Sequence, residues 1–214
     1  MPHRSIVAIF ALGIALGVAG AAAQNPVGKP PMDEEAPIAE ARDALPPGEN
    51  LLAPPPQGWE LAFSDRDDDR AVYDYVPPGQ DAEEWRAMMT VQVLFDAKGQ
   101  APRTVLERLR REFDGACDGA QAEPVAERAV TAYPGARQLL ICGRSRRGGK
   151  GEVALIQIVV GREAAYAVQH AWRGEAFRGT ALTADLRGII AGWHRQLDSV
   201  GICDTRVPSR PCAR

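Results

Sequence analysis

Two segments in the second half of the chain are apolar at nearly every position, and this pattern constrains the fold strongly. They are Leu139-Leu140-Ile141 and Leu155–Val160, in which Gln157 is the single polar residue. A strand with one face in water alternates apolar and polar side chains, whereas a strand without alternation needs cover on both faces. The sequence therefore predicts a sheet whose centre is buried from both sides.

Further strands surround these two segments. Trp59–Phe63 and Arg70–Val76 are predicted to form a hairpin through the polar residues 64–69, and residues 86–95 alternate as a third strand. After a helix, four more strands are predicted, separated by turns at Pro134-Gly135, at 147–150 and at 161–163: Val125–Tyr133, Arg137–Cys142, Glu152–Val160 and Ala164–Trp172.

Two helices complete the pattern. The first begins at Pro102 and ends near Gly115, and its apolar stripe is Val105, Leu106, Leu109 and Phe113. The second is predicted from about Thr183 to Val200, with the stripe Leu186, Ile189, Ile190, Trp193 and Leu197. The order βββ-α-ββββ-α predicts an α+β domain, an antiparallel sheet of about six to seven strands sandwiched by helices.

The second helix contains two glycines four residues apart, Gly188 and Gly192. Each costs about 1 kcal/mol relative to alanine in a helix. We interpret them as a close contact between helix and sheet. The alternative interpretation is a ligand that approaches the bare backbone.

Residues 1–23 have the features of a secretory signal peptide. His3 and Arg4 precede an apolar run from Ile6, which closes on Ala21-Ala22-Ala23 before Gln24. The sequence therefore predicts export to the periplasm and a mature chain that begins at Gln24 without a stable membrane anchor. Gln24 is not a cysteine, so no lipoprotein anchor is expected there. A retained transmembrane anchor is the alternative, because residues 6–23 approach the length of ~20 that a bilayer requires.

Residues 24–57 contain nine of the 17 prolines and are predicted to be a disordered leader. A proline-rich ligand for the groove of another protein is the alternative. Residues 58–214 are predicted to form a single α+β domain. After removal of residues 1–23, 24 Lys and Arg remain against 28 Asp and Glu, a net charge of −4. This charge disfavours nucleic acid as a partner.

All four cysteines lie in the exported part, where disulfides persist. Three connectivities are open, and we favour Cys117–Cys142 and Cys203–Cys212 because each pairs neighbours. The second bridge would tie the C-terminal tail to the end of a helix. A zinc site is the rival, but it prefers closely spaced ligand pairs such as C-x2-C.

Few residues are candidates for catalysis or for metal binding. His194 lies four positions before Asp198 and His170 lies in a strand, so either could act as a base with a carboxylate. Asp65, Asp67, Asp68 and Asp69 resemble part of a calcium loop, but the glycine and the glutamate of an EF-hand loop are replaced by Arg70 and Val76. A solvated hairpin turn is the simpler interpretation.

A basic hairpin tip contains Arg144, Arg146, Arg147 and Lys150 around Gly148-Gly149. It lacks the Walker pattern, because Gly151 follows Lys150 where Ser or Thr is required. Such a tip either contacts anionic lipid heads, lipopolysaccharide or a protein, or serves to keep the turn soluble.

Several motifs together resemble uncharacterised exported proteins of proteobacteria over residues 58–212. They are Trp59, Tyr75-Val76-Pro77-Pro78-Gly79, Trp85, residues 89–92, Cys117, Tyr133-Pro134, Cys142, Tyr166, Gln169, Cys203-Asp204-Thr205-Arg206 and Pro211-Cys212. Those proteins are similar to the PsbP-like fold, the α/β sandwich of a photosystem II subunit, a nuclear Ran-binding factor and periplasmic DcrB-type proteins. The resemblance implies a scaffold that binds other proteins and has no common catalytic site.

The sequence thus favours a non-catalytic periplasmic module of the cell envelope that binds a protein or a small ligand. No cofactor and no metal site are expected. The rival function is an envelope hydrolase that uses His194 or His170 with a carboxylate. A deep pocket converging on a histidine and an acid would favour the enzyme, whereas an open groove lined by Trp and Tyr would favour binding.

Overall fold

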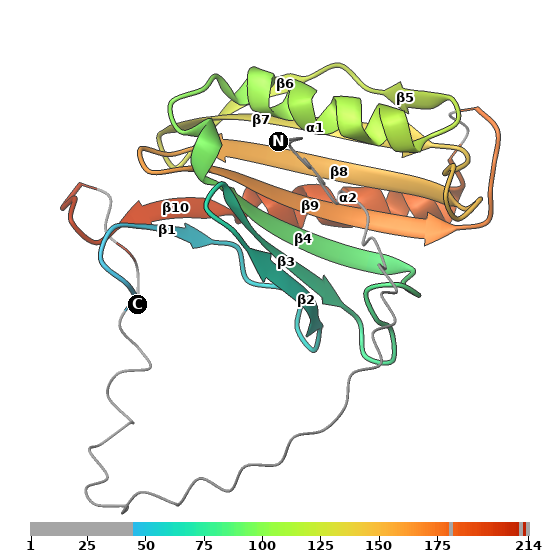
Figure 1. Ribbon diagram of the computed structural model, residues 1–214, viewed down its shortest axis with the longest axis horizontal. Helices are drawn as coiled ribbons and strands as arrows, with labels where there is room; N and C mark the ends of the chain where they lie inside the picture. The colour runs from blue at the N-terminus through green and yellow to red at the C-terminus, as the bar shows by residue number, and fades with distance from the viewer. Residues whose placement is uncertain (1–44, 180–181, 210–211, 213–214) are drawn as a thin grey trace, which may run out of the picture.

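Figure 1 shows the computed structural model, which describes residues 45–179, 182–209 and 212. The proposed signal peptide and the first part of the proposed leader lie outside the described residues. The remainder is an α+β domain with a large antiparallel sheet, a short two-stranded ribbon and two helices. This is the predicted fold class.

The main sheet has eight strands in the order β2-β3-β4-β9-β8-β7-β5, and β6 also pairs with β7. One strand more is present than predicted, because the three residues of β5 are too few to show a pattern. The strands are β2 (Glu60–Arg66), β3 (Arg70–Val76), β4 (Ala87–Leu94), β5 (Ala120–Ala122), β6 (Ala126–Val130), β7 (Tyr133–Cys142), β8 (Gly151–Val160) and β9 (Ala165–Gly174).

The centre of the sheet is covered on both faces, as its lack of alternation predicts. Every residue of β8 is buried. Helix α1 (Pro102–Ala116) packs Leu106 and Phe113 against one face, which contains Leu140 and Ile156. Helix α2 (Ala184–Asp198) packs on the opposite face (Figure 1), against the intervening residues of the same strands. Neighbouring residues of one strand therefore pack into two separate hydrophobic cores, one on each face of the sheet.

Local signals set the start of each helix. Pro102 occupies the first turn of α1, where its missing N–H is not needed. Thr183 caps α2, because its side-chain oxygen accepts a hydrogen bond from the Leu186 backbone N–H at 3.2 Å. Four residues of the predicted α2 stripe are buried, but Ile189 is 42% exposed. The stripe is therefore narrower than predicted.

The turn between β6 and β7 differs from the prediction. Pro134 and Gly135 lie inside β7, opposite Ala129 and Arg128, and the two-residue turn is Thr131-Ala132. Both turn residues have positive φ, 46° and 65°, as a tight hairpin turn requires. Pro134 is tolerated because the pairing of β7 with β8 begins only at Gly135.

A strand also occurs where the sequence predicts a disordered leader. β1 (Glu49–Leu52) pairs antiparallel with β10 (Gly201–Asp204), so the end of the 24–57 segment is ordered. Two disulfides join the cysteines in the favoured pairing, Cys117–Cys142 and Cys203–Cys212, with Cα atoms 5.7 and 4.8 Å apart. The second bridge ties the tail to Cys203 within β10, and not to the end of a helix as predicted.

Candidate functional site

A groove lies along the outer side of α2, where the helix faces Trp59 and the start of β4. Its volume is about 710 Å³, and it is broadly open to solvent. Its apolar walls are Pro56, Trp59, Ala87, Ile189, Gly192 and Trp193. Its polar rim is Arg195, Gln196 and Ser199, all on α2 or at its C-terminal end. An apolar floor with a few polar groups is the usual composition of a binding site.

The groove lies where the loop before β2 approaches α2, and Gly192 contributes no side chain to fill it. Ile189 lies one position before buried Ile190 and therefore faces away from the sheet. Trp193 packs its ring on the core but also contributes to the groove wall. Trp59 approaches from the loop that follows the proline-rich segment. Ligand contact is the role that this exposed apolar surface suits.

The two glycines of α2 do not make the close contact with the sheet that we predicted. A Cβ atom at Gly188 would meet nothing within 4 Å, and one at Gly192 would meet only the Arg195 guanidinium at 3.8 Å. Packing therefore does not require a glycine at either position. Gly192 instead leaves bare backbone inside the groove, which agrees with the alternative interpretation.

His194 lies in a polar network that joins the end of α2 to the sheet. Its Nδ1 is 3.2 Å from Nη1 of buried Arg137, and because guanidinium only donates, Nδ1 must accept. Neutral His194 then carries its proton on Nε2, so neither ring nitrogen is free to take a proton from a substrate. Partial burial and the Arg137 charge lower the pKa of His194.

Asp198 does not orient His194 as the hydrolase hypothesis requires. Its Oδ1 accepts hydrogen bonds from Arg128 at 2.7 Å and from Arg137 at 2.9 Å, and these bonds lower the pKa of Asp198. Gln157 completes the network: its Oε1 accepts from Arg137, and its Nε2 donates to the Leu197 carbonyl at 3.0 Å. The one polar residue of the apolar β8 segment thus anchors the last turn of α2.

His170 is also placed unsuitably for catalysis. It is 2% exposed on β9, and its ring lies parallel to Trp193 with centroids 6.1 Å apart. Burial lowers the pKa of His170 to about 4. A neutral imidazole enclosed between sheet and helix has no access to a substrate.

Of the four aspartates around the β2–β3 turn, Asp67 accepts hydrogen bonds from backbone N–H groups of the turn. Oδ1 of Asp67 accepts from the N–H groups of Asp69 at 2.9 Å and Arg70 at 2.8 Å, and these bonds lower the pKa of Asp67. Across the described residues, no three His, Cys, Asp or Glu side chains form a group that could hold a metal ion. No described helix has the length and hydrophobicity needed to cross a bilayer.

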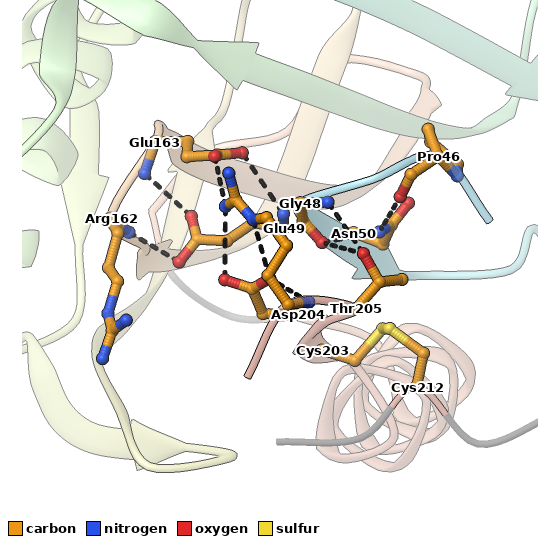
Figure 2. Close-up of polar contacts among 11 residues, drawn as sticks. Pro46, Gly48, Glu49, Asn50, Arg162, Glu163, Cys203, Asp204, Thr205 and Cys212 are labelled. Carbon is orange, nitrogen blue, oxygen red and sulfur yellow. Dashed lines mark hydrogen bonds and ion pairs between the residues drawn. A yellow bond between two sulfur atoms is a disulfide. The ribbon is translucent and has the colours of Figure 1, made fainter. Parts of the chain in front are cut away.

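Sequence reasoning missed a polar latch between the β1–β10 ribbon and the β8–β9 turn, which Figure 2 shows. The Glu49 carboxylate accepts from the backbone N–H groups of Arg162 at 2.7 Å and Glu163 at 2.8 Å. The Glu163 carboxylate in return accepts from the Glu49 N–H at 3.2 Å. A Cβ atom at Gly161 would overlap the Glu49 carboxylate, so a side chain there would displace this carboxylate from the turn.

The tail after β10 closes this latch. Arg206 forms ion pairs with Glu163 and with buried Asp204, and the pKa of Asp204 is lowered by the hydrogen bonds from Arg206. The Thr205 Oγ1 accepts from the Gly48 N–H at 2.8 Å. These groups satisfy one another, and we therefore interpret the latch as structural. No signal in the sequence pairs positions more than 100 residues apart.

No family model matches this sequence, and no curated protein matches it. Solved structures with a similar arrangement include a Pseudomonas aeruginosa protein of unknown function, with 15% identity over 69% of this chain and 87% of its own and a TM-score of 0.43. Mog1p, a Ran-binding protein of Saccharomyces cerevisiae, shares 12% identity over 66% of this chain and 77% of its own, with a TM-score of 0.41. LpqN, involved in cell envelope biogenesis of Mycobacterium tuberculosis, shares 12% identity over 75% of this chain and 87% of its own, with a TM-score of 0.40. At these scores the likeness carries no argument about function.

Proposed function

We propose that this chain is an exported, non-catalytic binding module that holds an extended segment of an envelope protein in the groove beside α2. The observation that carries the proposal is the groove itself, in which Trp59 and Trp193 flank the bare backbone at Gly192. Its volume lies within the range of protein binding sites, ~300–1,000 Å³. The placement of His170 and His194 supports binding over hydrolysis.

The shape and charge of the groove favour a peptide segment as its occupant. An open trough with aromatic walls suits an extended chain, whereas a small ligand prefers an enclosed cavity. The rim offers the side chains of Gln196 and Ser199 for hydrogen bonds with a peptide backbone. Arg195 is exposed and forms no ion pair within the described ranges, so it can attract a carboxylate of the partner. The partner segment is therefore apolar with an acidic residue nearby.

Export is part of the same proposal and has separate support. The charged start, the apolar run and the Ala21-Ala22-Ala23 sequence have the features that signal peptidase recognises. Two disulfides fit an oxidising compartment such as the periplasm.

A photocrosslinking experiment, combined with a variant that fills the groove, tests the proposal. A photoreactive benzoylphenylalanine replaces Ile189, and the exported protein is irradiated in envelope extract. We expect a discrete adduct whose partner peptide is extended, apolar and acidic, identified by mass spectrometry. The adduct should disappear in a Gly192→Leu background, since the new side chain occupies the groove.

Gly188→Leu is the matched control, because it adds the same side chain to the same helix outside the groove. Each variant should gain up to about 1 kcal/mol of helix stability, so a thermal melt should show no loss of folding. Persistence of the adduct in Gly192→Leu, or no adduct in any background, would refute the proposal.

A further inference from the structure

One end of the sheet carries a concentration of basic side chains. The β7–β8 turn contains Arg144, Arg146, Arg147 and Lys150, and the loop after β9 adds Arg178; all five are exposed. Both segments lie at the end where β8 begins and β9 ends (Figure 1). Arg144 and Arg178 line the same hollow of about 450 Å³. The two loops therefore form one basic surface, which we call the cationic end.

Backbone contacts hold the cationic end in shape. The Phe177 N–H donates to the Gly143 carbonyl at 2.9 Å, and a Cβ atom at Gly143 would come within 2.5 Å of the Phe177 carbonyl oxygen. In the β7–β8 turn, the Ser145 N–H donates to the Lys150 carbonyl at 2.7 Å. The backbone N–H of Arg146 donates to Ala116, the last residue of α1, at 2.9 Å. The cations are thus presented on a fixed backbone.

The charges of the cationic end are not neutralised within the domain. Within residues 45–179, 182–209 and 212, none of its five basic side chains forms an ion pair, whereas Arg103 pairs with Glu127 and Arg108 with Asp96. Glu175 is the exposed acidic residue of these two loops; exposed Asp118 follows α1, and exposed Asp81, Glu83 and Glu84 lie in the loop before β4 at the same end of the sheet. The two loops are therefore positive, with five basic side chains against one acidic one, although the whole chain has a net charge of −3. Such a separation of charge orients a protein toward an anionic surface.

We propose that the cationic end docks the protein onto the anionic headgroups of a lipid bilayer. The basic side chains are distributed over two loops and only Arg144 and Arg178 share a hollow, so they suit a plane of many charges rather than one phosphate. None of the strongly exposed apolar residues, Leu61, Phe63 and Ile189 among them, lies on these loops. Docking is therefore electrostatic, and salt screens it. The groove beside α2 involves different residues and remains free.

Vesicle sedimentation of the protein purified after export tests this inference. We expect binding to phosphatidylcholine vesicles that contain phosphatidylglycerol, no binding to phosphatidylcholine alone, and loss of binding as sodium chloride is raised. The double variant Arg147→Gln/Lys150→Gln should bind about 25-fold more weakly, because each of the two cations near an anionic bilayer contributes about a fivefold factor. Within the described residues neither side chain forms a hydrogen bond or an ion pair, and both side chains are exposed, so the fold should be unchanged.

The matched control is Lys98→Gln/Arg162→Gln, which removes the same charge at the opposite end of the sheet. It should bind vesicles like the parent, since Arg162 contributes only its backbone N–H to the latch. Equal weakening by both double variants, or binding to neutral vesicles, would overturn the inference. Displacement by inorganic phosphate but not by chloride at equal ionic strength would overturn it in favour of a single-anion site. Failure of vesicle binding leaves the groove proposal intact, because the crosslink does not depend on lipid.

Discussion

At the residue scale, the burial of His170 affects the free energy of unfolding in a way that depends on pH. The imidazole lies between Leu155 and Met89 on the sheet and against Trp193 on α2. Its Nδ1 has no hydrogen-bond partner among the described residues, and burial disfavours the charged form. The folded protein therefore keeps His170 neutral down to about pH 4, whereas the unfolded chain takes up the proton near 6.5.

This difference predicts acid destabilisation from His170. Between pH 6.5 and 4 the unfolded state binds more protons than the folded state, so the free energy of unfolding falls as pH is lowered through this window. The contribution is about 3 kcal/mol at most. We expect His170→Gln to gain stability relative to the parent by that amount as pH falls from neutral to acidic, measured by urea unfolding.

The comparison between parent and variant is necessary because other groups titrate in the opposite sense. Burial raises the pKa of Glu152 to about 7, so its contribution falls as pH rises from 4.5 to 7. That contribution is common to both proteins and cancels in the difference. A difference that does not vary with pH would contradict the neutral state assigned to His170.

At the element scale, the β6–β7 turn shows how a turn can form without the usual sequence signal. Thr131 occupies a left-handed position because its Oγ1 accepts from the Ile202 N–H at 3.0 Å and donates to the Ile202 carbonyl at 3.1 Å. These bonds tie the turn to β10. Ala132 has no such side-chain contact and yet adopts φ 65°.

The two turn residues should therefore respond oppositely to glycine. Ala132→Gly removes the left-handed strain and should stabilise the protein by up to about 1 kcal/mol. Thr131→Gly relieves the same strain but loses both bonds to Ile202, and it should destabilise by about 1 kcal/mol net. Thermal unfolding of the two variants measures this. A loss of stability in Ala132→Gly would show that the turn is not strained.

At the scale of the whole molecule, the latch and the Cys203–Cys212 bridge fix where both chain ends leave the domain. β1 enters and β10 leaves side by side, and the latch joins them to the β8–β9 turn (Figure 2). The cationic end lies at the opposite end of β8 and β9 from the β8–β9 turn (Figure 1). If the protein docks on lipid by its cationic end, β1 lies on the side of the domain away from the bilayer.

The proposed export predicts the N-terminus and the thiol content of the purified protein. If the protein is exported as proposed, the purified chain should begin at Gln24 and contain no free thiols, because signal peptidase would cleave after Ala23 and two disulfides join the four cysteines. Intact mass and a non-reducing peptide map measure both properties. Recovery of the uncleaved chain in the inner membrane would favour the retained anchor, and bound zinc would contradict the bridges. A crossed pairing would contradict only the connectivity.

The sequence alone determined seven strands of the main sheet, both helices and most of their buried faces. The continuous apolar residues of β7 and β8 indicate that both faces of these strands are buried. The spacing of apolar residues in α1 and α2 indicates one buried face on each helix, because hydrophobic periodicity follows from burial. Pro102 and Thr183 set helix starts by local bonding. Such signals lie within a few residues of the elements that they specify.

Only the tertiary structure decided where a ligand could bind. Trp59 and Gly192 are far apart in the chain, and only the packing of α2 on the sheet brings them to one groove. The β1–β10 pairing and the partners of His194 likewise depend on distant segments. The same glycine pattern fits both a buried contact and an exposed groove. The orientation of α2 on the sheet decides between them. Hydrophobic periodicity indicates how much of a helix is buried, but it does not indicate which residues lie beside the exposed face.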